Sequence, residues 1–172
     1  MSRRVALVTG SSRGIGLATA VALARAGFAV AVNGPADDDE LAQARAQVAD
    51  CGGDVFAAAF DVTDTRAHAS ALADIEAALG PLTTLVNNAG VGLATGVSPE
   101  EVINTNLYGV KRVTEAFVAT GLVSDRVVNV GSGSGPGYVR RCPRENQRAL
   151  CVAPASWDEI EGLLALSEDG RT

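Results

Sequence analysis

The sequence predicts an α/β protein with a doubly wound parallel sheet of about five strands. Short apolar runs alternate along the chain with longer segments rich in alanine and leucine, as in parallel strands joined by crossover helices. A glycine-rich turn, Thr9–Gly16, directly follows the first apolar run, Val5–Val8, and opens an alanine-rich helix. Because such crossovers are right-handed, and because this turn follows the first strand, we expect the strand order 3-2-1-4-5.

Each expected strand is a short apolar run, and glycine, proline or polar residues bound it. The five strands are expected at Val5–Val8, Ala29–Val32, Val55–Phe60, Leu82–Val86 and Arg126–Val130. In a parallel sheet their carboxyl ends meet at one edge, where open α/β proteins bind ligands. The glycine turn, Asp61, Asn87 and Ser132 all follow strands, so we expect them at that edge.

Four helices are expected between these strands. They are Gly14–Ala26, Asp39–Ala49, Thr65–Leu79 and Pro99–Thr120. Glycines at 52–53 and at 80 are stop signals for the second and third helices. Either Thr63 or Asp64 can cap the third helix, and Ser98, followed by a proline and two glutamates, is a strong start for the fourth.

The last part of the chain has a different pattern. Residues 137–155 carry four arginines and two prolines without a clear period, so we expect a solvated irregular segment. A capping box at 156–159 then opens an amphipathic helix to about Ser167. We therefore expect residues 1–137 to form the sheet domain, with 138–172 as an irregular segment plus helix of the same domain.

Composition limits the function classes. The chain has 172 residues, of which 47% are hydrophobic and 20% charged, so it can bury a core. A net charge of −6 argues against nucleic acid or an anionic membrane as the main partner. Three cysteines without metal-like spacing indicate a reducing compartment and no metal site. No leader or membrane span is apparent, so we expect a cytoplasmic protein.

The glycine turn is a candidate anion site. A helix that starts within this turn directs unpaired backbone N–H groups and its positive dipole end toward the mouth of the turn. A pyrophosphate is a natural ligand there. Glycine turns also join strands to helices without any ligand, so the wider context has to decide.

That context resembles the short-chain dehydrogenase/reductase family. The stretches that carry the resemblance are TGSSRGIG at 9–16, DVTD at 61–64, NNAG at 87–90, NLYG at 106–109 and VVNVGSGSG at 127–135. They span roughly residues 4–137 in the family's order and are most similar to its carbonyl-reductase-like branch. Members of that branch carry an inserted helical segment after the serine strand, and Pro143–Leu166 resembles it. The resemblance implies a Rossmann-type fold and hydride transfer between a nicotinamide cofactor and a carbonyl or alcohol.

The resemblance also implies roles for individual residues. The implied cofactor-binding residues are Gly10, Ser11, Ser12, Arg13, Gly14, Ile15, Gly16, Asn33, Asp61, Val62, Asn87, Ala89 and Gly90. Within this set Asp61 matches the carboxylate that binds the adenine amino group, although an aspartate after a strand can also simply cap a turn. The implied catalytic residues are Ser132, which binds the substrate carbonyl, with Ser134 as a weaker candidate, and Asn106, which holds a water. Asn106 could instead be an ordinary surface asparagine.

The choice between NADP and NAD depends on the end of the second strand. A carboxylate at this position grips the ribose 2′-hydroxyl and repels a 2′-phosphate. Here the residue is the neutral Asn33, and Arg13 in the glycine turn could meet a 2′-phosphate. We therefore expect NADP(H), with NAD as the alternative. The aspartates at 37–39 come too late for the ribose position unless the loop folds back, and we interpret them as a solvated helix start.

One departure from the family concerns catalysis. The family's reaction uses a tyrosine and a lysine four residues later, which lowers the tyrosine pKa. Here the tyrosines are Tyr108 and Tyr138, the single lysine is Lys111, and no such pair exists. The last strands of the family are also missing, which leaves the fifth strand at an edge unless the C-terminal segment covers it. His68, in mid-helix, is expected at a surface or half-buried position without a catalytic role.

Two classes of function remain open. The first is a short-chain dehydrogenase/reductase-type oxidoreductase, apparently truncated and impaired, acting on a small-molecule carbonyl or alcohol. The alternative is a non-catalytic dinucleotide-binding module or an interaction remnant that uses its edge strand. We expect no nucleic-acid or membrane partner, and we count a homo-oligomer among the partners to be tested.

Overall fold

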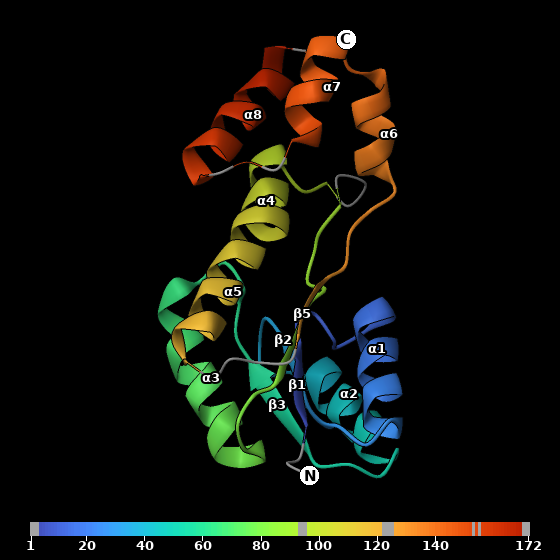
Figure 1. Cartoon of the computed structure of the whole chain (residues 1–172). Coiled ribbons are helices and arrows are strands. Elements are labelled where there is room, and N and C mark those ends of the chain that lie inside the picture. Colours follow the sequence, from blue (N-terminus) through green and yellow to red (C-terminus); the bar gives the residue numbers. More distant parts are fainter. Residues whose placement is uncertain (1–3, 93–95, 122–125, 153, 155, 170–172) are drawn as a thin grey trace. The chain divides into compact units, whose positions relative to one another are not determined.

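The computed structural model describes residues 4–92, 96–121, 126–152, 154 and 156–169. The chain divides into two compact units, Met1–Val130 and Gly131–Thr172, which are described separately (Figure 1). The first unit contains the sheet, and the second is helical. None of the helices in the described ranges is long and apolar enough to cross a membrane.

The first unit contains a parallel sheet of five strands. The strands are β1 (Val5–Val8), β2 (Ala29–Gly34), β3 (Val55–Ala59), β4 (Thr84–Asn87) and β5 (Arg126–Asn129). All four neighbouring pairs are parallel, and the order is β3-β2-β1-β4-β5. The predicted doubly wound order is therefore confirmed, and the carboxyl ends of the strands share one edge.

Helices join the strands at nearly the predicted positions. They are α1 (Gly14–Arg25), α2 (Asp39–Ala49), α3 (Thr65–Leu79), α4 (Pro99–Ile103), η2 (Asn104–Gly109) and α5 (Val110–Ala119). Asp38 and Asp64 cap α2 and α3 through backbone N–H groups of the first turns. Ser98 and Glu101 form the capping box that starts α4.

The long helix expected at 99–120 is interrupted by a π-helical segment. Residues Asn104–Gly109 form η2, which separates α4 from α5. Its last residue, Gly109, is buried, and a Cβ atom there would lie 3.0 Å from Cγ2 of Val62. A π-segment is not visible in apolar periodicity, and such segments recur at functional sites.

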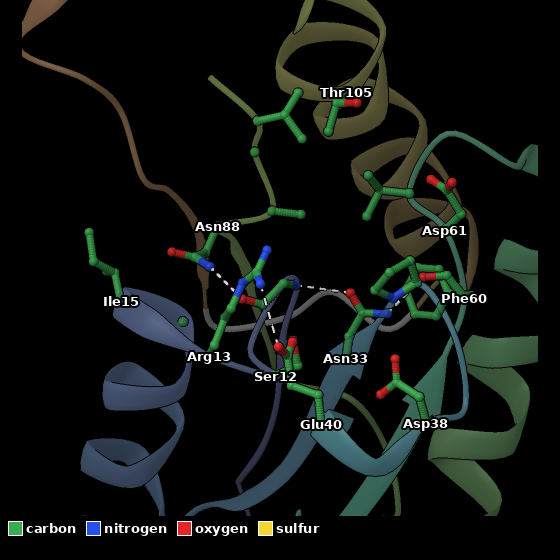
Figure 2. Close-up of a pocket in the computed structure, with 17 residues that line it drawn as sticks. Ser12, Arg13, Ile15, Asn33, Asp38, Glu40, Phe60, Asp61, Asn88 and Thr105 are labelled. Atoms are coloured by element: carbon green, nitrogen blue, oxygen red, sulfur yellow. Dashed lines mark hydrogen bonds and ion pairs between the residues drawn. The ribbon is translucent and has the colours of Figure 1, made fainter. Parts of the chain in front are cut away.

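The side chain of Asn33 ties the glycine turn to two strands. Its Oδ1 accepts a hydrogen bond of 3.0 Å from Gly10 N–H, and its Nδ2 donates to the carbonyl oxygens of Ala58 and Phe60 at 2.9 Å each (Figure 2). Asn33 is 2% exposed. Ser11 adds a second tie, because its Oγ accepts from Asn33 N–H. The turn after β1 is thus held against β2 and β3 by buried hydrogen bonds.

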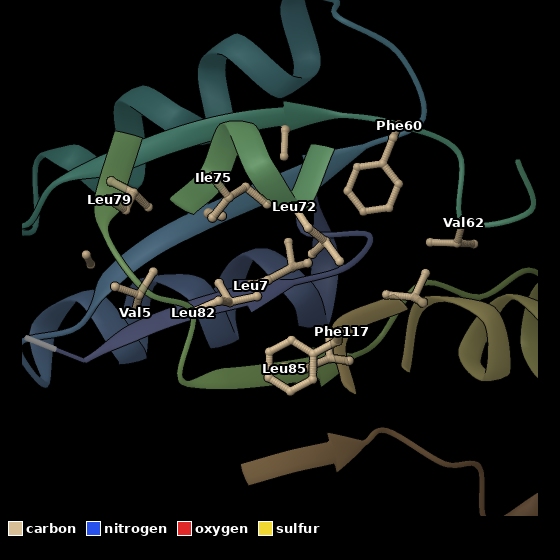
Figure 3. Packing of buried hydrophobic residues seen from close by; sticks show 14 residues of the cluster. Val5, Leu7, Phe60, Val62, Leu72, Ile75, Leu79, Leu82, Leu85 and Phe117 are labelled. Carbon is tan, nitrogen blue, oxygen red and sulfur yellow. The ribbon is translucent and has the colours of Figure 1, made fainter. Parts of the chain in front are cut away.

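Two apolar clusters cover the two faces of the sheet. Leu7 of β1 belongs to the cluster with α3 and α5, whereas the next residue, Val8, belongs to the cluster with α1 and α2. Figure 3 shows Leu72 and Ile75 of α3 together with Phe117 of α5 in the first cluster. Because β1 is covered on both faces, its four residues are all buried.

His68 departs from its expected position. The prediction of a surface or half-buried side chain is wrong, because His68 is 3% exposed on the inner side of α3. Its ring meets Phe60 edge-on, with centroids 5.8 Å apart. The histidine therefore belongs to the packing of α3 beneath the end of β3.

Among the described residues, the edge strand β5 pairs only with β4. Val127, Val128 and Val130 are 40–44% exposed. The expectation of an apolar edge strand thus agrees with the topology of the first unit.

The described part of the second unit contains three helices. They are α6 (Ser134–Arg141), α7 (Arg144–Cys151) and α8 (Trp157–Asp169). The expected start of the last helix is confirmed, since Ser156 Oγ accepts from Glu159 N–H. The stretch expected to be irregular instead forms α6 and α7, which carry the arginines. Gln147 caps the end of α6 by donating to Cys142 O at 2.7 Å, a local contact that apolar periodicity does not reveal. Membership of both units in one domain stays a prediction.

Phe117→Ala tests the packing of the first unit. The side chain is 1% exposed, so its truncation should lower the free energy of unfolding by about 3–5 kcal/mol. Val118→Ala is the matched control on the same helix, because Val118 is 64% exposed and its truncation should cost less than about 0.5 kcal/mol. Equal losses in urea unfolding would contradict this description of the core.

Asn33→Asp tests the buried tie of the turn. The introduced carboxylate cannot donate to the carbonyls of Ala58 and Phe60, so the substitution should cost about 3 kcal/mol at neutral pH. Burial beside two carbonyls should raise the pKa of the introduced carboxyl above its unfolded value. The introduced carboxyl then stays protonated to higher pH in the native state than in the unfolded state. The loss of unfolding free energy relative to the wild-type chain should therefore grow as pH rises from 4 to 7. If the free energy of unfolding is unchanged in Asn33→Asp, or if its loss shrinks with rising pH, the proposed role of the Asn33 hydrogen bonds is wrong.

Candidate functional site

A cavity of about 610 Å³ lies at the carboxyl ends of β1, β2, β3 and β4. Its walls come from the glycine turn after β1, the loop after β2 with the start of α2, the DVTD turn after β3 and the NNAG turn after β4 (Figure 2). Thr105 of η2 completes the lining. The first four strands thus place separate polar loops around one crevice. The sequence predicts the loops after β1, β3 and β4 at this edge, whereas Ser132, also expected there, is not part of the lining.

Two of the glycines in the turn are required by close packing. Gly10 has a φ of 61°, and a Cβ atom there would lie 2.7 Å from Cα of Ala89. A Cβ atom at Gly16 would lie 2.3 Å from the carbonyl oxygen of Gly10 and 2.4 Å from Nδ2 of Asn88. Gly14 has a φ of 58°, and a Cβ atom there would meet no described atom within 4 Å. Gly10 and Gly16 therefore let the turn touch the loop after β4, whereas Gly14 serves the left-handed backbone.

Asn88 joins these two loops and was missed by the sequence reasoning. Its Nδ2 donates to the carbonyl oxygens of Thr9 and Gly10, at 3.0 Å each. In return Thr9 Oγ1 accepts from the backbone N–H groups of Asn88 and Ala89. The signal available in the sequence was the second asparagine of NNAG, a residue type that bonds backbone groups in turns.

The start of α1 faces the crevice as an anion site would. Arg13 is the N-cap residue, and its side chain makes no capping bond to the first turn. Ile15 and Gly16, which belong to that turn, line the cavity. The backbone N–H groups of a first helical turn have no partner within their helix, and they carry the positive end of its dipole. A phosphate group is the ligand class that this arrangement suits best.

Most of the predicted cofactor residues are brought together. Those that line the cavity are Gly10, Ser12, Arg13, Ile15, Gly16, Asn33, Asp61, Val62, Ala89 and Gly90. Ser11, Gly14 and Asn87 are not part of the lining. Ser11 is buried and donates to Val8 O at 2.7 Å. Asn87 is buried as well, and its Nδ2 donates to Thr114 and Asn129, which ties β4 to α5 and β5.

Asp61 performs the turn function that the sequence left open. Its Oδ1 accepts from both the backbone N–H and the hydroxyl of Thr63, at 2.8 Å each. Both bonds end on one oxygen, so the carboxylate is fixed while its second oxygen can accept a further bond. Asp61 also lines the cavity. Its contact with adenine stays a prediction.

Acidic residues at the start of α2 reach the crevice. Asp38 and Glu40 line the cavity, although the sequence indicated only a solvated helix start. The Glu40 carboxylate accepts from the Ser12 hydroxyl and lies 3.4 Å from Nη1 of Arg13. The loop after β2 therefore folds back over the end of the sheet, which residue spacing alone does not reveal.

Asn106 lies on η2 and holds the loop after β4. Its Oδ1 accepts from Val91 N–H at 2.8 Å, and its Nδ2 donates to Val91 O at 2.9 Å. The side chain thereby pairs with one backbone residue in the manner of a neighbouring strand. This contact explains why an asparagine stands here, and the predicted role with a catalytic water stays a prediction.

Ser132 and Tyr138 belong to the second unit. Ser132 is exposed, and its Oγ accepts from Ser134 N–H at 3.1 Å. The pKa of Tyr138 is raised above its usual value, chiefly by a hydrogen bond with the Cys142 side chain. A family-type acid/base tyrosine requires the opposite shift. Tyr138 is therefore poorly suited to that role in its present surroundings.

Comparison with known proteins agrees with the crevice and its motifs. The family model described as short chain dehydrogenase matches residues 4–142. An acetoacetyl-CoA reductase from Rhizobium meliloti strain 1021 is 43% identical over 141 residues, which cover 77% of this chain and 56% of that protein. The chain thus spans about half the length of this relative.

Solved structures show the same arrangement. A variant of actinorhodin polyketide ketoreductase with NADPH has a TM-score of 0.70 and 32% identity, over 78% of this chain and 55% of that one. A metagenomic short-chain oxidoreductase in complex with NADP has a TM-score of 0.67 and 33% identity, over 78% and 63% of the two chains. The family model covers the residues that form the sheet and the crevice, and the chain belongs to the short-chain dehydrogenase family.

Proposed function

We propose that this chain binds a nicotinamide dinucleotide in its crevice and takes part in hydride transfer between that cofactor and a carbonyl or alcohol. The observation that carries the proposal is the convergence of four loops at the ends of β1 to β4 around one cavity of about 610 Å³. Family membership supports the reaction class. The cofactor, when bound, supplies or accepts the hydride.

The residues of the crevice fit a dinucleotide. The first turn of α1 would hold the pyrophosphate. Asp61, fixed by Thr63, would accept from the adenine amino group, with the Val62 backbone beside it. Ala89 and Gly90 would line the path of the nicotinamide ribose, since they border the cavity after β4.

NADP(H) is the proposed form of the cofactor, with NAD(H) as the alternative. The end of β2 carries a neutral side chain, Asn33, whose Oδ1 and Nδ2 are hydrogen-bonded to backbone groups of Gly10, Ala58 and Phe60. Arg13 lines the cavity and carries the positive charge that a 2′-phosphate requires. The two solved structures described above contain NADPH and NADP.

A ketone is the proposed substrate. The relative from Rhizobium meliloti is named for acetoacetyl-CoA, and the actinorhodin relative is a ketoreductase. Ser132 would donate to the carbonyl oxygen of such a substrate, and Asn106 would hold a water on the proton path. A β-ketoacyl thioester is therefore the first compound to test.

A non-catalytic dinucleotide-binding module is the second candidate. The sequence contains no tyrosine followed four residues later by lysine. Tyr138 has Cys142 at that spacing, and the hydrogen bond with Cys142 raises the tyrosine pKa instead of lowering it. This observation favours cofactor binding without turnover by the 172 residues alone.

Arg13→Ala tests the proposed cofactor. We expect the wild-type chain to bind NADPH more tightly than NADH, and the variant to lose about 1 kcal/mol, or about fivefold, in NADPH affinity alone. The loss is moderate because the guanidinium is 82% exposed. Both dinucleotides are titrated by the fluorescence of the reduced nicotinamide. Equal losses for NADH and NADPH would remove Arg13 from the 2′-phosphate site.

The 172-residue chain should bind NADPH but oxidise it slowly or not at all in the presence of acetoacetyl-CoA, quinones, aldehydes or simple ketones. The reason is that proton transfer needs an acid within reach of the substrate oxygen, and no lysine lowers the pKa of Tyr138. The assay follows NADPH absorbance in the presence of each substrate.

Two variants interpret any turnover that is found. Robust turnover that disappears in Tyr138→Phe would contradict the prediction and assign the acid to Tyr138. Turnover that survives in Tyr138→Phe but is lost in Ser132→Ala would indicate that water supplies the proton.

A further inference from the structure

The Glu40 carboxylate contacts two side chains of the crevice that could otherwise bind an anionic ligand, Ser12 and Arg13. Its Oε1 accepts from the Ser12 hydroxyl at 2.5 Å, and its Oε2 lies 3.4 Å from Nη1 of Arg13. Figure 2 shows the three side chains together at the end of the crevice near Asn33 and Asp38. All of them line the same cavity. The Glu40 carboxylate therefore already accepts from the hydrogen-bond donors that an anionic ligand would use here.

The fold, rather than a loose loop, brings Glu40 to this position. Glu40 lies in the first turn of α2, and Asp38 caps that helix by accepting from Leu41 N–H at 2.9 Å. A Cβ atom at Gly34 would lie 3.6 Å from Cβ of both Ser12 and Leu41. The end of β2, the start of α2 and the glycine turn thus lie in direct proximity.

The two nicotinamide cofactors differ only by a phosphate in place of the ribose 2′-hydroxyl. A hydroxyl can donate to the Glu40 carboxylate, so it can join the existing contacts. A phosphate can only accept, and it carries a charge of the same sign. It would have to displace Glu40 from Ser12 and Arg13, or lie against the carboxylate.

We propose that Glu40 sets the choice between the two cofactors by opposing the 2′-phosphate, and so limits the preference for NADP(H) that Arg13 creates. This assignment rests on the proposed function, because it requires a dinucleotide in the crevice with its adenosine ribose at the end of β2. Glu40 acts through its charge and through the two donors that it occupies.

The size of the effect follows from exposure. The side chains of Arg13 and Glu40 are 82% and 46% exposed, so solvent and salt screen their interaction. Glu40→Gln keeps the length of the side chain and removes the charge. We expect it to increase NADPH affinity about threefold and to change NADH affinity less than about twofold at low salt.

Asp39→Asn is the matched control. Asp39 is exposed, lies in the same helical turn and is not part of the cavity lining. The Asp39→Asn substitution removes the same charge from the same helix end as Glu40→Gln. A general electrostatic effect on the binding of the pyrophosphate would therefore appear in both variants. The ratio of the NADH and NADPH dissociation constants should change in Glu40→Gln and stay constant in Asp39→Asn.

The experiment titrates the full chain and both variants with NADPH and NADH by fluorescence. Adenosine 2′,5′-bisphosphate and 5′-AMP, measured by calorimetry, serve as second probes that differ in the 2′-phosphate alone. Glu40→Gln should favour the bisphosphate in the same proportion as NADPH. Thermal unfolding of each variant checks that the fold is intact.

Each other outcome overturns the assignment in a distinguishable way. An unchanged ratio in Glu40→Gln, with both dinucleotides still bound, overturns the role of Glu40 and leaves the proposed function intact. Weaker NADPH binding would mean that Glu40 positions Arg13 for the phosphate. If the wild-type chain and both variants bind neither dinucleotide, the proposed function fails, and the role of Glu40 fails with it.

Discussion

The hydrogen bond from Gly10 N–H to the Asn33 side chain is the constraint on which the crevice depends. It forms between the turn after β1 and the end of β2, and Nδ2 of the same side chain extends the tie to two carbonyls at the end of β3. Buried amide groups of this kind stabilise a structure only when every partner is present. The Asn33 side chain thus fixes the positions of the carboxyl ends of β1, β2 and β3 relative to one another.

The loop after β4 is joined to the same turn from the other side. Asn88 donates to the carbonyl oxygens of Thr9 and Gly10, and Gly16 leaves space for that contact. The turn is thus held from both sides, and the first turn of α1 follows directly from it. The proposed anion site at this helix start therefore depends on contacts from the whole sheet edge.

The sequence was sufficient for the features that follow from periodicity and from local capping. Buried strands such as Val5–Val8, and the cap at Ser98, were predicted at their observed positions. It was insufficient where folding brings distant residues together. Glu40 reaches Ser12 across 28 residues only because the loop after β2 turns back. The helices α6 and α7 did not show in the apolar pattern, because each is eight residues long and buries no side chain; only the family resemblance indicated helix in the region of α7.

The contacts around the crevice divide its residues into two groups with different freedom to vary. Asn33 and Asn88 hold the turn through buried or part-buried hydrogen bonds, so a change at either position alters the scaffold itself. Ser12, Arg13 and Glu40 face the same cavity from exposed positions and bond mainly to one another. Substitutions in this second group should change the stability of the fold little, because these side chains are exposed or half-buried. Cofactor preference in such a scaffold can drift between lineages while the sheet and its turns stay the same.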